Sequence, residues 1–124
     1  MGEKIMVVDD SVSMRQMTGI ILTQAGYETV QAADGNEALE KFDDSIKLLI
    51  TDYNMPNMNG IELIKSIRNG NVNKAVPILM VTTESEDEKK MEGKEAGATG
   101  WITKPFDKDL LLNTIKKITQ AVEF

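Results

Sequence analysis

Short apolar runs alternate with longer amphipathic segments along the chain. Five of the runs are rich in β-branched residues and have the length of buried strands: Ile5–Val8, Thr29–Ala32, Leu48–Thr51, Ile78–Val81 and Trp101–Thr103. Regular alternation of such runs with helical segments is typical of a parallel sheet with helices on both faces, joined by right-handed crossovers. The pattern therefore predicts an α/β fold with a single doubly wound sheet of five parallel strands.

The segments between the strands carry helical signals. Apolar side chains recur at helical spacing in two of them, and we expect these faces to pack on the sheet: Met14, Met17, Ile21 and Ala25, and Leu111, Ile115, Ile118 and Val122. A small polar residue followed three positions later by Glu indicates a helix start: Asp34 with Glu37, Asn59 with Glu62, and Ser85 with Glu88. Gly26 and Gly97 stand where helices are expected to end.

Polar side chains follow four of the predicted strands: Asp9 and Asp10 the first, Asp52 the third, Thr82 and Thr83 the fourth, and Lys104 the fifth. The carboxyl ends of parallel strands lie at one edge of the sheet, where open α/β folds bind their ligands. Three carboxylates brought together there repel one another, so a cation is expected among them. Carboxylate oxygens are ligands that suit Mg²⁺, and we predict a magnesium site.

Composition narrows the chemistry of this site. The chain carries 14 basic and 20 acidic residues and a formal charge of -6, and it shows no basic stripe, so we expect no binding to nucleic acid. It contains neither cysteine nor histidine, which excludes disulfides and thiolate zinc sites and removes the usual general base. No signal peptide or membrane span is indicated, and we expect a cytoplasmic protein with no membrane association.

Phosphoryl transfer fits the groups that remain. An aspartate is a competent nucleophile toward phosphorus, and the reaction needs mainly positioning and neutralisation of oxygen charge. Asp52 follows the central strand, so we assign it as the phosphoryl acceptor, with Lys104 pairing a phosphoryl oxygen and Thr82 donating its hydroxyl. A chain without histidine cannot be the phosphohistidine donor, so the phosphoryl group is expected to come from another protein.

Four segments resemble the receiver domains of two-component response regulators: MVVDDSVSMR, LLITDYNMPNMNG, PILMVTTES and AGATGWITKPF. The resemblance runs from Lys4 to Val122 and is strongest to stand-alone chemotaxis regulators of the CheY type. It implies a flavodoxin-like (β/α)5 fold with strand order 2-1-3-4-5. It also implies that residues 1–124 form one receiver domain without an effector domain.

The same resemblance implies the ligands of the metal. Asp10 and Asp52 would bind Mg²⁺ directly, the backbone carbonyl of Asn54 would be a third ligand, and Asp9 would contribute through water. The Lys104–Pro105 peptide bond is expected to be cis, as X-Pro bonds can be.

The resemblance also implies a switch formed by Thr82 and Trp101. The hydroxyl would move toward the phosphoryl group while the aromatic ring turns inward, which would alter the face formed by the fourth helix, fifth strand and fifth helix. Tyr or Phe is commoner in the family at Trp101, and the larger ring without a phenolic hydroxyl is expected to swing incompletely. Thr83 stands in place of a smaller residue and is expected to crowd access to Asp52, with its backbone N–H available to a phosphoryl oxygen.

Asn54 and Glu84 hold the positions that flank the path of attacking water in this family. We expect the amide and the carboxylate to permit rapid self-dephosphorylation, as a short-lived behavioural signal requires.

The predicted function is therefore a response regulator phosphorylated on Asp52 by a chemotaxis histidine kinase in a Mg²⁺-dependent reaction. The expected output is binding to a flagellar motor switch protein, which would control flagellar rotation, and a phosphatase is a possible further partner. We expect a monomer that catalyses only its own phosphorylation and dephosphorylation and is not an enzyme. The alternative is a phosphorelay intermediate or phosphate sink that passes the group to a histidine phosphotransfer protein.

Two other classes fit less well. A Mg²⁺-dependent phosphatase with an aspartate nucleophile usually carries a second acid two residues on, where this chain has Asn54. A flavin-binding module of the same fold would need a Ser/Thr/Gly-rich cradle for the flavin phosphate after the first strand, and none is present.

Overall fold

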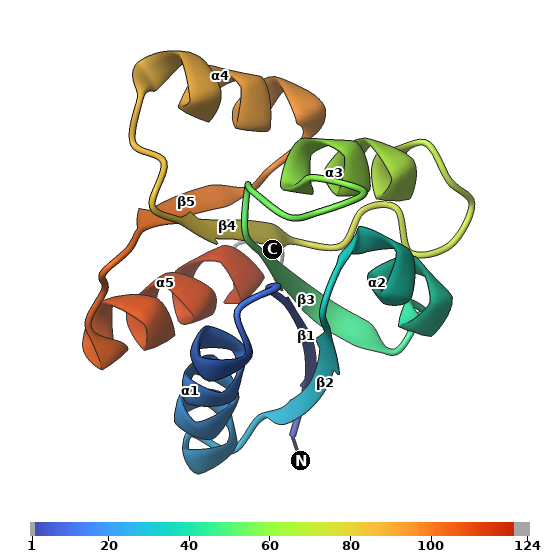
Figure 1. The fold of residues 1–124 in the computed structure, drawn as a ribbon. Coiled ribbons are helices and arrows are strands. Elements are labelled where there is room, and N and C mark those ends of the chain that lie inside the picture. Colours follow the sequence, from blue (N-terminus) through green and yellow to red (C-terminus); the bar gives the residue numbers. More distant parts are fainter. Residues whose placement is uncertain (1, 121–124) are drawn as a thin grey trace.

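The computed structural model describes residues 2–120, in which five strands and five helices alternate. Their bounds are β1 (Lys4–Val8), α1 (Val12–Gln24), β2 (Glu28–Ala32), α2 (Gly35–Lys41), β3 (Ile46–Thr51), α3 (Gly60–Arg68), β4 (Ile78–Thr82), α4 (Asp87–Ala96), β5 (Gly100–Thr103) and α5 (Lys108–Gln120). All strand pairs are parallel, and the order in the sheet is β2-β1-β3-β4-β5 (Figure 1). The predicted α/β class and strand order are confirmed.

The sheet is covered on both faces, which explains why its central strands are apolar throughout. Successive side chains of a strand point to opposite faces. In β1, Met6 and Val8 belong to a core that includes residues of α2 and α3, whereas Ile5 and Val7 belong to a second core that includes residues of α1 and α5. Figure 1 shows α1 and α5 on one side of the sheet, with α2, α3 and α4 on the other.

The α1 helix packs only in part by the predicted face, because Ile21 packs against the core that contains Ile5 and Val7 but the most buried positions are others. Its buried residues are Thr18, Gly19 and Leu22, whereas Met17 is 41% exposed. Gly19 and Thr18 are small residues on the side of the helix that faces β2, where the side chain of Gln31 lies nearby. The spacing of apolar residues therefore identified only part of the packing face.

The α5 helix packs as predicted. Leu111 and Ile115 are fully buried, and Ile118 packs at the edge of the same core. The fourth predicted position, Val122, lies outside the described residues.

Two of the three predicted helix starts are confirmed. The side chains of Asp34 and Asn59 cap α2 and α3, and Asn59 forms a complete capping box with Glu62. The predicted helix start at Ser85 is wrong. A cap at Ser85 would place the first helical residue at Glu86, whereas α4 begins one residue later and has no side-chain cap. Acidic residues in the first turn instead complement the positive end of the helix dipole.

Glycines end α1 and α4 as predicted. Gly26 and Gly97 have φ angles of 98° and 117°, which side chains other than glycine rarely adopt. The guanidinium of Arg68, at the end of α3, donates through two nitrogens to the carbonyl of Gly97, at 3.2 and 2.8 Å, and through a third to the carbonyl of Lys74, at 2.6 Å. The carboxyl-terminal ends of α3 and α4 are thus tied together.

Within residues 2–120, no helix has both the length and the apolar character that crossing a membrane requires.

Candidate functional site

Three carboxylates meet at the carboxyl edge of the sheet. Asp9 and Asp10 follow β1 and Asp52 follows β3, and these strands are neighbours paired up to Val8 and Thr51. One oxygen from each carboxylate lies within 4.8 Å of the others. The side chains of Asp9 and Asp52 are only 9% and 13% exposed, whereas Asp10 is open to solvent. The predicted convergence of these residues is thus observed.

The ammonium of Lys104 bridges two of these carboxylates. Its Nζ lies 2.9 Å from Oδ2 of Asp9 and 3.1 Å from Oδ2 of Asp52, and its side chain is only 11% exposed. Burial acts to lower the pKa of Lys104, but the hydrogen bonds and charges of both carboxylates outweigh it, so its pKa is raised above 10.5. The peptide bond to Pro105 is cis.

Backbone groups fix the other oxygens of the same carboxylates. Oδ1 of Asp9 accepts the N–H of Ser11, at 2.9 Å, and Oδ1 of Asp52 accepts the N–H of Tyr53, at 2.6 Å. The loop after β3 turns back tightly, and a Cβ at Gly60 would clash with the carbonyl oxygen of Asp52. Asp52 is thus positioned by its own loop as well as by the sheet.

The donor set fits a hard divalent cation. Three carboxylates face one ammonium, so the site keeps a formal excess of two negative charges. In the part of the chain that the structure describes, the carboxylate of Asp10 has no hydrogen-bond or ion-pair partner, which leaves its oxygens available to a metal. Oxygen-only coordination with few protein carboxylates is the preference of Mg²⁺. Asn54, the other predicted ligand, lies on the adjacent loop and directs its N–H toward Oδ1 of Asp52, at 3.4 Å.

The two threonines after β4 differ in environment. Thr82 is fully buried, and its hydroxyl accepts a long hydrogen bond of 3.4 Å from the N–H of Glu84. Thr83 is exposed and lines a mostly apolar hollow of about 490 Å³ beside Lys104, to which Met14 and Met17 also contribute.

Trp101 lies half-buried against α4. Its indole N–H donates to the carbonyl of Glu84, at 3.0 Å, and its ring faces Gly93, where a Cβ would lie 2.8 Å from Cζ3 of the indole. It also packs at a tilt of 54° against Tyr53, with 6.3 Å between ring centroids. The indole N–H, which the sequence analysis did not consider as a donor, thus ties Trp101 to the loop after β4.

Glu84 joins the loop after β3 to α4. Its carboxylate accepts from the side-chain amide of Asn54, at 2.7 Å, and from Nζ of Lys89, at 2.8 Å. The hydrogen bond from Lys89, followed by that from Asn54, holds the pKa of Glu84 below its usual value. Lys89 lies 5.4 Å from the centre of the Tyr53 ring, whose hydroxyl donates to Glu92 and whose pKa is raised chiefly by that bond.

Tyr53, Lys89 and Glu92 were missed by the sequence analysis. They come from two segments that are far apart in the chain, and the charged run that holds Lys89 has the composition of an ordinary solvated helix start. No spacing rule links them.

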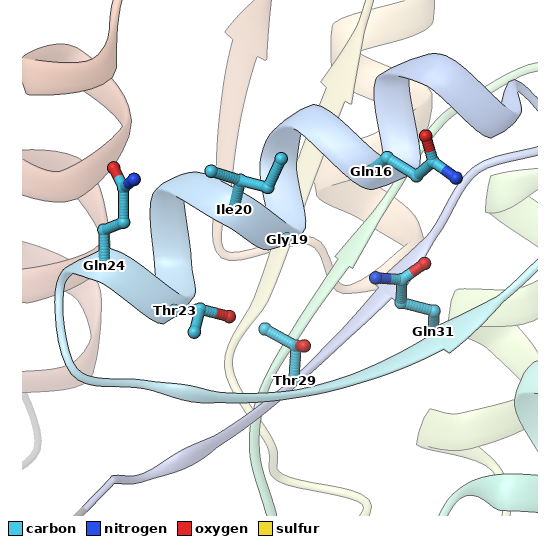
Figure 2. A pocket seen from close by; sticks show the side chains of 7 residues that line it. All are labelled: Gln16, Gly19, Ile20, Thr23, Gln24, Thr29 and Gln31. Carbon is cyan, nitrogen blue, oxygen red and sulfur yellow. The ribbon is translucent and has the colours of Figure 1, made fainter.

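A second hollow, of about 360 Å³, lies between α1 and β2 and carries none of this chemistry (Figure 2). Its lining has no titratable side chain and consists of Gln16, Gly19, Ile20, Thr23, Gln24, Thr29 and Gln31. The carboxylate site is therefore the better candidate for function.

Comparison with known proteins identifies the family to which the chain is similar. The family described as response regulator receiver domain matches residues 5–116. Chemotaxis protein CheY1 of Helicobacter pylori strain J99 is 42% identical over 118 residues, covering 93% of this chain and 95% of that protein. Chemotaxis protein CheY of Pseudomonas aeruginosa is 37% identical over 121 residues, covering 96% and 98%.

Solved structures give the same result. Chemotaxis protein CheY4 of Vibrio cholerae superposes with a TM-score of 0.88 at 47% identity, covering 95% of this chain and 99% of that one. A CheY-like response regulator receiver domain protein of Methanospirillum hungatei superposes with a TM-score of 0.91 at 30% identity, covering 99% and 98%.

Proposed function

The chain belongs to the family of response regulator receiver domains, and from that premise we propose that it is a chemotaxis response regulator phosphorylated on Asp52. A histidine kinase supplies the phosphoryl group in a Mg²⁺-dependent reaction. The phosphorylated protein then acts by binding a partner, in the first instance a protein of the flagellar motor switch. Two chemotaxis proteins align with this chain over nearly their whole length, and this similarity supports the assignment.

The observation that carries the proposal is the bridge from Lys104 to Asp9 and Asp52, beside the free carboxylate of Asp10. An oxygen of Asp52 attacks phosphorus, an O–P bond forms, and the N–P bond of the donor phosphohistidine breaks. The imidazole leaves with the electron pair of that bond. A carboxylate nucleophile has no proton to lose on attack, so the step requires no general base.

Neutralisation of oxygen charge falls to groups around Asp52. The ammonium of Lys104 moves from the carboxylate to a phosphoryl oxygen. The hydroxyl of Thr82 and the backbone N–H of Thr83 donate hydrogen bonds to the other phosphoryl oxygens. Asp10 and Asp52, with the carbonyl of Asn54 and with Asp9 through water, would hold Mg²⁺. When bound, this cation would supply the positive charge that offsets the excess of carboxylates.

The switch uses the contacts of Glu84. When the hydroxyl of Thr82 turns to the phosphoryl group, the N–H of Glu84 loses its long hydrogen bond and the loop after β4 is free to shift. The carbonyl of that same residue holds the indole of Trp101, so the shift is transmitted to the face of α4, β5 and α5. The phosphorylated state changes the populations of two packings by the difference in their contacts.

The phosphoryl lifetime is set by Asn54 and Glu84, which hydrogen-bond to each other beside Asp52. Replacing either by alanine is expected to change the rate of self-dephosphorylation. An unchanged lifetime in both variants would contradict this role.

The experiment is phosphorylation by a kinase or by acetyl phosphate, followed on phosphate-affinity gels with Mg²⁺ or with EDTA. We expect an acid-stable, base-labile product in the presence of Mg²⁺ only, and none in Asp52→Asn. Labelling that persists in Asp52→Asn would refute the assignment of the acceptor.

Output is tested separately with beryllofluoride, which mimics the aspartyl phosphate. Tighter binding of the treated protein to the amino-terminal peptide of a flagellar switch protein supports the motor role. Rapid transfer of the phosphoryl group to a histidine phosphotransfer protein, without peptide binding, favours the relay or phosphate-sink alternative.

A further inference from the structure

Two methionines of α1 line the mostly apolar hollow of about 490 Å³ beside Lys104. Met14 and Met17 are three residues apart, so they lie on one face of the helix. The rest of the lining consists of Thr83, Lys104, Pro105 and Phe106. Lys104 is the only charged residue among these six. The hollow therefore places two thioethers beside the ammonium of the carboxylate site.

Exposure distinguishes these methionines from those of the core. The chain has eight methionines and no cysteine, so thioethers are its only sulfur groups. Met17 is 41% exposed and Met14 is half-buried, whereas Met6 and Met80 are completely buried. An oxidant must reach the sulfur to convert a methionine into its sulfoxide, so the pair on α1 is open to oxidation and the core methionines are protected.

Oxidation would change what this hollow offers to Lys104. A thioether is a weak hydrogen-bond acceptor, whereas a sulfoxide is polar and accepts through its oxygen. An ammonium has three N–H donors, and two of those of Lys104 are directed to Asp9 and Asp52, at 2.9 and 3.1 Å. One donor remains for a further acceptor. Because a polar group in an apolar hollow is costly unless it is hydrogen-bonded, a sulfoxide formed there favours this ammonium as its partner.

We infer that Met14 and Met17 form an oxidation site that lowers the reactivity of Asp52. The sulfoxide oxygen accepts a hydrogen bond from Lys104 and competes with the phosphoryl oxygen for the same ammonium. The inference rests on the proposed function, because it names a regulation of the carboxylate site that receives the phosphoryl group.

The oxidant is a peroxide. The thioether sulfur donates an electron pair to one oxygen of hydrogen peroxide, an S–O bond forms, and the O–O bond breaks. The hydroxide that leaves takes the proton of the transferred oxygen and becomes water. Sulfur is thus oxidised by two electrons and the peroxide is reduced by two. Methionine sulfoxide reductases reverse the change with a dithiol, which becomes a disulfide while the oxygen leaves as water.

The experiment compares the protein before and after treatment with hydrogen peroxide. Peptide mass mapping locates the added oxygen, which we expect on Met14 and Met17 and not on Met6 or Met80. Phosphorylation by acetyl phosphate with Mg²⁺ should become about tenfold slower, as the loss of one hydrogen bond to a charged group would give. Reduction of the sulfoxides by methionine sulfoxide reductases should restore the rate.

The test of the residues is the double variant Met14→Leu/Met17→Leu, which removes both thioethers and keeps apolar side chains of similar volume. The matched control is Met91→Leu. Met91 is 56% exposed and lies on α4, on the opposite face of the sheet from α1 (Figure 1). Each variant is compared with its own untreated sample. Peroxide should leave the rate of the double variant unchanged and should slow Met91→Leu as much as the wild type.

A second measurement does not depend on phosphorylation. The NMR signal of the Lys104 side-chain nitrogen, assigned by its absence in Lys104→Met, should shift when the wild type is oxidised and stay in place in Met14→Leu/Met17→Leu. An unmoved signal in the oxidised wild type, an unchanged phosphorylation rate after oxidation, or equal slowing in the double variant would overturn the oxidation site. An untreated wild type that accepts no phosphoryl group would refute the proposed function, and a shifted Lys104 signal would then still support the contact between the sulfoxides and the ammonium.

Discussion

Replacing Lys104 by methionine tests whether its ammonium holds the carboxylate site together. The substitution keeps an unbranched side chain of similar length and removes only the charge and the donor. In the wild type the ammonium lies 2.9 and 3.1 Å from carboxylate oxygens of Asp9 and Asp52, in a site where all three side chains are largely buried. The variant leaves three carboxylates with no internal cation.

The magnitude follows from these distances. At an effective dielectric constant of about 20, each contact contributes about 5 kcal/mol of attraction, and most of that is offset by the cost of removing the charges from water. Removing one partner of a fully buried pair costs about 3–5 kcal/mol. Because Asp10 and one edge of the site are open to solvent, we expect Lys104→Met to lower the free energy of unfolding by about 2–3 kcal/mol in EDTA.

The assay is urea unfolding at neutral pH, with EDTA and with Mg²⁺. A cation bound by the same oxygens should reduce the loss of stability in the variant, because it neutralises the carboxylate charge that the ammonium neutralises in the wild type. Lys108→Met is the matched control, since this exposed lysine lies at the start of α5 and makes no described ion pair. It should change stability by less than about 0.5 kcal/mol.

The pH dependence gives an independent check. The pKa of Lys104 is raised in the folded protein, so its contribution to stability is complete below the unfolded value of 10.5 and is lost as the pH rises through the folded pKa. The gap between wild type and Lys104→Met should be constant at neutral and mildly alkaline pH and should close above about 10.5. Equal stability of the variant and wild type in EDTA would refute the reasoning.

Three further substitutions test the surrounding structure. Gly93→Ala should displace the indole of Trp101, because the new Cβ would lie 2.8 Å from the ring, and the fluorescence emission should shift. The gain in helix propensity of about 1 kcal/mol limits any loss of stability. An unchanged emission spectrum would contradict the observed packing. Arg68→Met removes three hydrogen bonds between α3 and its neighbours and should lower the free energy of unfolding in urea by about 2–3 kcal/mol. A change below about 0.5 kcal/mol would show that the tie between α3 and α4 does not contribute to stability. Asn59→Ala should cost about 1 kcal/mol as a lost cap, whereas Ser85→Ala should cost almost nothing, and equal losses would restore the capping role that the sequence suggested for Ser85.

Much of the fold was predictable because burial on both faces of a parallel sheet leaves a continuous apolar run in the sequence. Each predicted run falls within an observed strand, and a polar residue stands at or just after the carboxyl end of every strand except β2. The convergence of four polar residues could therefore be predicted, because a parallel sheet brings the carboxyl ends of all its strands to the same edge. These residues are Asp9, Asp10, Asp52 and Lys104.

Contacts between side chains of distant segments were not predictable in this way. The packing of α1 through Thr18, Gly19 and Leu22 depends on how the helix is rotated over the sheet, and the spacing of apolar residues does not record that rotation. Likewise, the pairing of Lys104 with Asp9 depends on the direction in which the loop after β5 sends the side chain.

The sequence by itself determined which residues stand at the strand ends, and hence the composition of the carboxylate site. Only the tertiary structure decided how that site is connected to the rest of the molecule, through Glu84 to Trp101 and to Lys89 of α4. The physical reason is that periodicity records whether a side chain is buried. It does not record how helices and loops are oriented, and that orientation decides which other side chains a given side chain contacts.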